Sequence, residues 1–236
     1  ASESVVPWQW SDMMGLWCPF AGSTGSRLLD LSGRNEHGTF TNMDATDWVT
    51  GSYMGPAILG DNSESHHVVF TAGHLKPSNA LTVVVWFEPT IGENGNTRLT
   101  CWDGGSNNAF EIYLRDKGSN LGIRAGVRTT SGNSTIHDAF TPTAGLYQVV
   151  QTFCHGTHTM YRNGNQVGQT TGLGMSINYS AFGSQSFALM ADAASGGGSF
   201  FEGKVHKVAV YERAWTRVPV ADECSDRFAA VRQNRL

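Results

Sequence analysis

The loop from Trp102 to Asn108 combines the residue types that proteins use to bind sugars. A sugar ring stacks its C–H face on an indole ring, while amide, carboxylate and backbone groups bond the hydroxyls. Trp102, Asp103, Asn107 and Asn108 could supply these contacts. The alternative is an ordinary turn with Trp102 in the core, because large aromatic side chains are mostly buried. This loop is our candidate ligand-binding site.

Two further tryptophans, Trp8 and Trp10, precede the first strand-like segment and follow Pro7. The sequence in this region offers no obvious core position for both indole rings, and exposed tryptophans usually contact a partner. Residues 1–12 are therefore a candidate arm that docks on a neighbouring subunit, or else pack on the outside of their own domain.

Eight histidines invite a metal-site interpretation, above all His66 with His67 and His155 with His158. Residues one or three positions apart on a strand face opposite sides, so neither pair forms a two-ligand face unless a loop bends it. The sequence also lacks the G-x-S-x-G, H-E-x-x-H and G-x-x-x-x-G-K-[ST] motifs. This removes the familiar mechanisms of serine hydrolases, zinc proteases and phosphate-binding loops.

The composition indicates many short strands joined by tight turns. Hydrophobic residues make up 40% of the chain, charged residues 15%, and glycine occurs 28 times. All-β sandwiches of about 200–250 residues commonly form one domain, so the 236 residues here predict one.

Charge and hydropathy exclude two classes of partner. The net charge of −4 comes with no stripe of Lys and Arg that could neutralise phosphates, so we expect no nucleic acid ligand. No apolar run approaches the roughly 20 residues that cross a bilayer, so we expect no membrane insertion. Residues 1–4 show no features of a signal peptide, which leaves open whether one has been removed.

The four cysteines lie far apart in the sequence: Cys18, Cys101, Cys154 and Cys224. A chain of this length buries a core without covalent cross-links, which favours buried thiols over one or two disulfide bonds.

Alternating or β-branched runs bounded by Gly, Asn, Asp and Pro predict antiparallel strands along the whole chain. The clearest runs are residues 81–88, 110–114, 122–129, 147–153, 158–162, 187–190 and 205–211. Between two of them, Asn163-Gly164 predicts a type I′ hairpin turn, because both residues tolerate the positive φ angles of that turn.

The end of the chain has helical periodicity. Val220, Cys224, Phe228 and Val231 recur at spacings of four, four and three residues. Residues 216–236 should therefore form a short C-terminal helix and basic tail, whose apolar stripe packs on the domain or which extends from it.

Three groups of motifs, in this order, resemble the laminin G-like jelly-roll family of concanavalin A-like proteins. They are Gly15–Phe20 with the D-x-S-G-x-x-x-x-G loop from Asp30, the strand Leu81–Pro89, and the hairpin Met160–Gly164 with the closing strand Phe201–Ala214. The resemblance covers nearly the whole chain and implies an all-β fold, an antiparallel two-sheet jelly-roll β-sandwich. The periodicity of the last residues adds a short C-terminal helix to it. The expected division is an arm at 1–12, the sandwich at 13–215 and the tail at 216–236.

The resemblance also implies a calcium site, since calcium is the usual cofactor of such domains and is held by loop oxygens. Asp30, Ser32 and Asn35 would be the ligands. However, His206 and Lys207 stand where the family carries an acidic residue, and a cation beside a lysine is disfavoured. We therefore expect no cofactor, with Asp30 and Ser32 capping a turn instead.

Enzymes of the same superfamily carry signatures that this sequence lacks. Glycosidases need two carboxylates on one strand, whereas Glu111 and Asp116 lie five residues apart and so face opposite sides. The signatures of polysaccharide lyases are missing too. An enzyme should show clustered ionisable side chains in a groove, and the sequence shows no such cluster, so we expect no catalytic activity.

Our leading interpretation is a non-catalytic surface module that binds a glycan or a protein through loops at one end of the sandwich. The first alternative is a structural or decoration subunit of a bacteriophage particle that assembles through its termini as a homo-oligomer or on a virion shell. A lyase or glycoside hydrolase is the second. Each of the first two implies an extracellular or virion-surface location.

Overall fold

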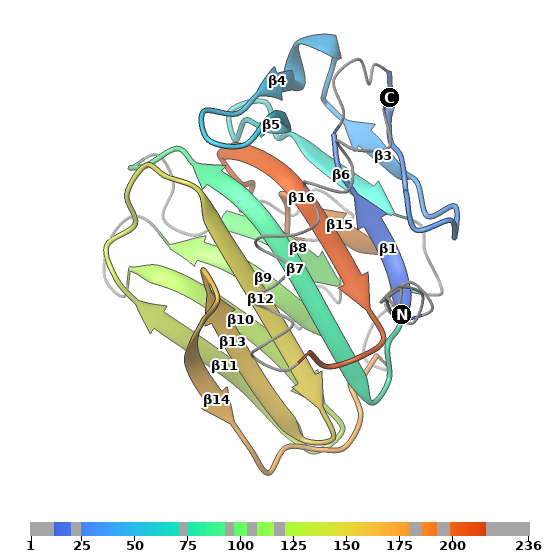
Figure 1. Cartoon of the computed structure of the whole chain (residues 1–236). Coiled ribbons are helices and arrows are strands. Elements are labelled where there is room, and N and C mark those ends of the chain that lie inside the picture. Colours follow the sequence, from blue (N-terminus) through green and yellow to red (C-terminus); the bar gives the residue numbers. More distant parts are fainter. Residues whose placement is uncertain are drawn as a thin grey trace, which may run out of the picture.

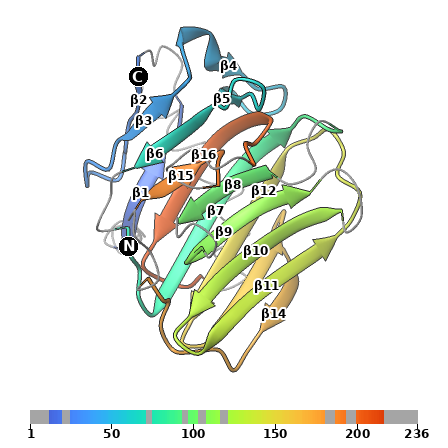
Figure 2. The same ribbon diagram turned by 180° about the vertical axis from the view of Figure 1, so that it is seen from behind.

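The computed structural model describes residues 12–19, 25–70, 75–92, 97–102, 108–115, 121–179, 186–192 and 199–215. Their strands form two antiparallel sheets of eight strands each, which face one another as a sandwich (Figures 1 and 2). The predicted all-β sandwich is confirmed. No helix among these residues is long and apolar enough to span a membrane.

We call the first sheet the A sheet. Its strands, in spatial order, are β14 (Asn165–Thr170), β13 (Thr157–Arg162), β12 (Tyr147–Cys154), β7 (Ala80–Pro89), β16 (Gly203–Tyr211), β5 (Pro56–Gly60) and β4 (Trp48–Thr50), and β1 (Met13–Trp17) pairs with β16.

The B sheet lies behind the A sheet in Figure 1 and in front of it in Figure 2. Its order is β11 (Gly132–Ala139), β10 (Gly122–Thr129), β9 (Phe110–Arg115), β8 (Thr97–Trp102), β15 (Phe187–Leu189), β6 (His67–Phe70), β3 (Gly38–Thr41) and β2 (Arg27–Leu28). A short 3-10 helix, Ala45–Asp47, precedes β4.

The hydrophobic core fills the space between the sheets because alternate side chains of each strand point inward. Strand β9 shows the pattern: Phe110, Ile112 and Leu114 belong to the core, so Glu111 and Tyr113, at the alternate positions, face outward. At the other end of the sandwich, Trp17 packs with its ring centroid 4.5 Å from that of Phe70.

All seven strands predicted from the sequence are present, with ends that differ by no more than two residues. In the predicted hairpin turn, Asn163 and Gly164 have φ angles of 50° and 79°, as a type I′ turn requires. The Asn163 carboxamide also accepts a hydrogen bond from the Gln148 amide at 2.8 Å, which fixes the turn to β12.

The predicted C-terminal helix in 216–236 lies outside the described residues, as do residues 1–11 of the predicted arm. Cys18, Cys101 and Cys154 carry thiols, and Cys101 is fully buried in β8.

Candidate functional site

A pocket of about 240 Å³ opens on the outer face of the B sheet, over β8, β9, β10 and β11. Its side chains come from four strands and from residues that border two loops. Those that carry the argument are Arg98, Asn108, Glu111, Arg128, Asn133 and Asp192. They face outward because their strand neighbours, such as Ile112 and Val127, lie in the core.

Gly126 forms the floor of the pocket. In the strand register, Gly126 of β10 lies between Glu111 of β9 and Thr135 of β11. A Cβ atom at this position would lie 2.9 Å from Glu111 Oε1, so the carboxylate leans over bare backbone. A residue with a side chain at this position would displace the Glu111 carboxylate.

The two carboxylates of the pocket are bridged by the same two side chains. Arg98 Nε lies 3.0 Å from Glu111 Oε2 and 3.5 Å from Asp192 Oδ1. Asn108 Nδ2 donates to the same two oxygens, at 2.6 Å and 3.4 Å. These charges are therefore held in a fixed arrangement and not left free to rotate.

A layer of aromatic and cationic side chains supports Arg98. Its guanidinium lies over the Tyr113 ring, 4.4 Å from the centroid, in a cation–π contact. Arg124 contacts the same ring at 5.8 Å, and its Nη1 donates to the Tyr113 hydroxyl at 3.4 Å. Strands β8, β9 and β10 thus position Arg98 through their outward side chains.

Three polar atoms of the Arg98 and Asn108 side chains can still form a hydrogen bond. Arg98 Nε and Nη1, which are donors, and Asn108 Oδ1, an acceptor, are buried and make no hydrogen bond within the part of the chain that the structure describes. Buried polar atoms are nearly always satisfied in proteins, and a bound ligand is one way to satisfy them. The pocket therefore has the means to bond a polar ligand.

The same geometry argues against acid–base hydrolysis. A glycosidase needs one carboxyl group that carries a proton to donate to the leaving group. Here Glu111 and Asp192 are both ion-pair partners of one guanidinium, and both accept a hydrogen bond from Asn108 Nδ2. The arrangement suits recognition better than proton transfer.

The structure corrects the expected role of Trp102. Its ring is fully buried, its Nε1 donates to the Leu75 carbonyl at 2.6 Å, and it meets Tyr179 edge-on with centroids 4.8 Å apart. A ring in this position has no face to offer to a sugar, so the alternative of a core tryptophan fits. Asn108 of the same loop does line the pocket, whereas Asp103 and Asn107 lie outside the described residues.

Trp8 and Trp10 also lie outside the described residues, so their role in assembly stays a prediction.

The Asp30 loop does not fit a calcium site. Asp30 Oδ1 accepts hydrogen bonds from the amides of Leu16 (3.0 Å) and Ser32 (2.9 Å), and Oδ2 accepts from the Ser32 hydroxyl (2.7 Å) and the Glu36 amide (3.0 Å). Burial raises the pKa of Asp30, but these hydrogen bonds outweigh it and leave the pKa below its usual value. A cation would have to compete with four donors.

Asn35, the third proposed calcium ligand, has a φ angle of 61°, which asparagine tolerates in tight turns. The loop that contains Asp30, Ser32 and Asn35 is held by hydrogen bonds that its backbone amides donate to the Asp30 carboxylate. This is the arrangement expected if Asp30 and Ser32 cap a turn.

His206 and Lys207, which replace the acidic residue of the family pattern, are both buried. His206 Nε2 lies 2.9 Å from Glu88 Oε1, and its Nδ1 lies 3.2 Å from the Pro56 carbonyl. Glu88 also accepts hydrogen bonds from the amides of Ser52 and Tyr53. His206 and Glu88 therefore form a buried pair, and Glu88 in turn holds the turn between β4 and β5 through the Ser52 and Tyr53 amides.

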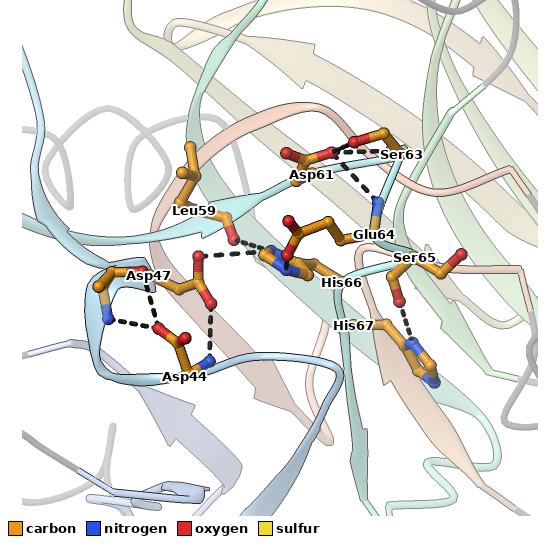
Figure 3. A network of polar contacts seen from close by, with 10 residues as sticks. Asp44, Asp47, Leu59, Asp61, Ser63, Glu64, Ser65, His66 and His67 are labelled. Atoms are coloured by element: carbon orange, nitrogen blue, oxygen red, sulfur yellow. Dashed lines mark hydrogen bonds and ion pairs between the residues drawn. The ribbon is translucent and has the colours of Figure 1, made fainter.

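The neighbours His66 and His67 bond different groups, as Figure 3 shows. His66 Nε2 lies 2.9 Å from Glu64 Oε2, while His67 Nδ1 lies 2.9 Å from the Ser65 carbonyl. His155 is exposed, and His158 is buried between the sheets. Within the described ranges, no three side chains of His, Cys, Asp or Glu gather to hold a metal ion.

Sequence reasoning missed the pocket and wrongly stated that no ionisable cluster exists. Arg98, Glu111, Arg128 and Asp192 are far apart in the sequence and meet only through the strand register. A signal was present in β9 and β10, where polar and charged residues occupy the outward positions of both strands. Which residue lies opposite which could not be read from that pattern.

A family model described as the concanavalin A-like lectin/glucanases superfamily matches residues 61–221. No curated protein matches the chain.

Solved structures of similar fold include single domains of larger proteins. Domain 4 of AbnA, a GH43 extracellular arabinanase from Geobacillus stearothermophilus solved with arabinotriose, matches with a TM-score of 0.63 at 20% identity, over 89% of this chain and 97% of that one. The binding domain of botulinum neurotoxin DC, solved with SialylT, matches with a TM-score of 0.67 at 10% identity, over 91% and 51%.

A sialidase from Trypanosoma rangeli matches with a TM-score of 0.60 at 13% identity, over 89% of this chain and 32% of that one. The chain thus spans about half of the neurotoxin domain and a third of the sialidase. At these identities the likeness is one of fold.

Proposed function

The chain belongs to the concanavalin A-like lectin/glucanase superfamily, and on that premise we propose that it is a non-catalytic module that binds an uncharged glycan in the pocket of the B sheet. The observation that carries the proposal is the fixed set of donors and acceptors around Gly126. An extracellular location is part of the proposal.

The charge balance of the pocket supports an uncharged ligand. Arg98 and Arg128 stand against Glu111 and Asp192, so the lining has no net charge to attract an anion or a cation. A sugar hydroxyl both donates and accepts hydrogen bonds, which matches a lining that offers both. Asn133 and Asn108 add amide groups, which also do both.

The size of the pocket supports a single sugar ring. Its 240 Å³ lies below the roughly 300–1,000 Å³ that holds drug-sized ligands. Asn108 follows residues 103–107 and Asp192 precedes residues 193–198, so the pocket borders two loops, but it opens on the face of the B sheet and not at the sandwich end where the sequence predicted recognition. Two of the structural relatives were solved with glycans. Both support a glycan as the ligand, and arabinotriose, which is uncharged, also supports an uncharged one, whereas SialylT carries an anionic sialic acid.

The test is a glycan array followed by calorimetry on the full chain and on two pocket variants. Glu111→Gln removes one charge of the bridge, and Asn133→Ala removes an exposed amide from the rim. Loss of a hydrogen bond to the ligand should weaken binding about tenfold. Asn165→Ala is the matched control, because Asn165 is an exposed strand asparagine on β14 of the A sheet.

Equal affinities for the two pocket variants and the control would place the glycan elsewhere. If no glycan binds, the ligand of the module should instead be a protein, which is the other kind of ligand expected from the sequence. Cleavage of a bound oligosaccharide would revive the hydrolase or lyase alternative. The bacteriophage-subunit alternative depends on the arm formed by residues 1–12 and stays a prediction.

A further inference from the structure

The outer face of the A sheet, opposite to the pocket, carries a second apolar cluster. Its side chains come from five neighbouring strands and from the residue that ends the described chain. We call it the A-face cluster; its members are Met13, Leu16, Val84, Trp86, Val150, Tyr161, Ala209, Tyr211 and Trp215.

This cluster is buried although it points away from the core. Val84, Val150 and Ala209, on the three central strands, are 0% exposed. The partly buried side chains known to pack against the cluster are Cys18, Leu31, Met54 and Leu146. These come from the loops and strand ends that border the cluster, so the centre of the face, over β7 and β12, is where a further apolar segment of the same chain would pack.

The path of the chain after β16 shows where that segment comes from. Thr82 on β7 donates a hydrogen bond to the Arg213 carbonyl at 2.5 Å and accepts one from the Trp215 amide at 3.0 Å. The Trp215 ring packs 4.4 Å from the Tyr211 ring. By Trp215 the chain has therefore left β16 and lies over β7, on the A-face cluster itself.

We propose that residues 216–236 continue across this face and cover the A-face cluster with the apolar stripe Val220, Cys224, Phe228 and Val231. As a helix, the stripe would span about 16 Å at 1.5 Å per residue. From β16 across β7 and β12 to β13 is three strand spacings, or about 14 Å. The length and the helical repeat of the segment thus match the width of the face.

Residues 1–11 are the competing cover. They enter the structure next to Asp12, whose carbonyl accepts a hydrogen bond from the Glu212 amide at 2.8 Å. This point lies at β1, on the border of the cluster, whereas Trp215 already lies over β7. The C-terminal segment therefore has the shorter path to Val84 and Val150.

The experiment compares the full chain with one that lacks residues 216–236 and one that lacks residues 1–11. An exposed apolar face binds the dye ANS, so removal of 216–236 should raise ANS fluorescence severalfold and cause self-association in light scattering. A synthetic peptide of residues 216–236 should reverse both effects. Removal of 1–11 should change neither.

A point variant keeps the proposal falsifiable if the shortened chain does not fold. Phe228→Ser removes the largest side chain of the stripe, and Arg227→Ser changes its neighbour on the polar side. Only Phe228→Ser should raise ANS fluorescence and lower the midpoint of thermal unfolding. Identical behaviour of the two variants, or an ANS response to removal of residues 1–11 alone, would overturn the proposal.

Discussion

Glu88 and His158 are both buried, but their surroundings favour opposite charge states. Burial raises the pKa of Glu88, yet hydrogen bonds from the Tyr53 and Ser52 amides and the charges of His206 and Lys204 outweigh it and lower the pKa. Within the described ranges, the hydrogen-bond partners of the His158 ring are the neutral side chains of Ser134 and Gln151. Burial alone lowers its pKa to about 4, which keeps the ring uncharged at neutral pH.

The pKa of His158 predicts a pH-dependent stability. Below pH 6.5 the unfolded chain binds a proton at this residue, while the folded chain does not until the pH falls to about 4. The free energy of unfolding should therefore fall as the pH drops through this window, by about 3 kcal/mol in total. Urea unfolding of the wild type and of His158→Gln between pH 7.5 and pH 4 measures the difference.

His155→Asn is the matched control, because His155 is exposed and asparagine tolerates its φ angle of 42°. The control should keep the wild-type pH profile, whereas His158→Gln should flatten it. Parallel profiles for the wild type and His158→Gln would show that His158 does not stay neutral in the folded protein.

At the scale of the element, the β13–β14 hairpin depends on backbone conformation. Gly164 has a φ angle of 79°, where an alanine is strained. Gly164→Ala should therefore lower the free energy of unfolding by about 1 kcal/mol. Denaturant unfolding at neutral pH checks this value, with the slope against denaturant unchanged.

Gly145→Ala is the control for the hairpin variant. Gly145 is a loop glycine just before β12, and a Cβ atom there would meet nothing within 4 Å. Its replacement should leave stability unchanged or raise it slightly, because alanine restricts the unfolded chain. A loss at Gly145 as large as at Gly164 would contradict the argument from positive φ.

How far each strand could be predicted depended on how it is buried. Strand β7 is apolar on both faces, since one lies in the core and the other in the A-face cluster, and its sequence identified it at once. Strand β11 was not predicted, because only Ser134 and Ile136 are buried among its eight residues and its sequence resembles a polar loop. Short runs such as β2 give no periodicity to detect.

The candidate site could be predicted only in part. The sequence pointed to Asn108, which lines the pocket, but attached it to Trp102, which packs in the core. The alternation of polar and apolar residues shows which face of a strand is buried, but it does not show which residues of neighbouring strands lie opposite one another. The ion pair of Arg98 with Asp192 joins residues 94 positions apart, and only the register of β8 against β15 brings them together.

At the scale of the whole molecule, the proposed function predicts a monomer. Light scattering coupled to size exclusion on the full chain and on a chain without residues 1–12 should give the monomer mass for both, because a binding module needs no partner subunit. An oligomer that dissociates when the arm is removed would instead favour the structural-subunit alternative.

The hydrogen bond between Glu212 and Asp12 brings the two ends of the described body together on the A sheet, while the pocket opens on the B sheet. If residues 216–236 cover the A face as proposed, a polypeptide joined to the end of the chain would hold the module from the A-sheet side and leave the pocket open to solution. Several such modules joined in one polypeptide could then bind sugars on the same surface at the same time. Each would raise the effective concentration of the next, so a weak single-site affinity could give strong avidity without any new contact.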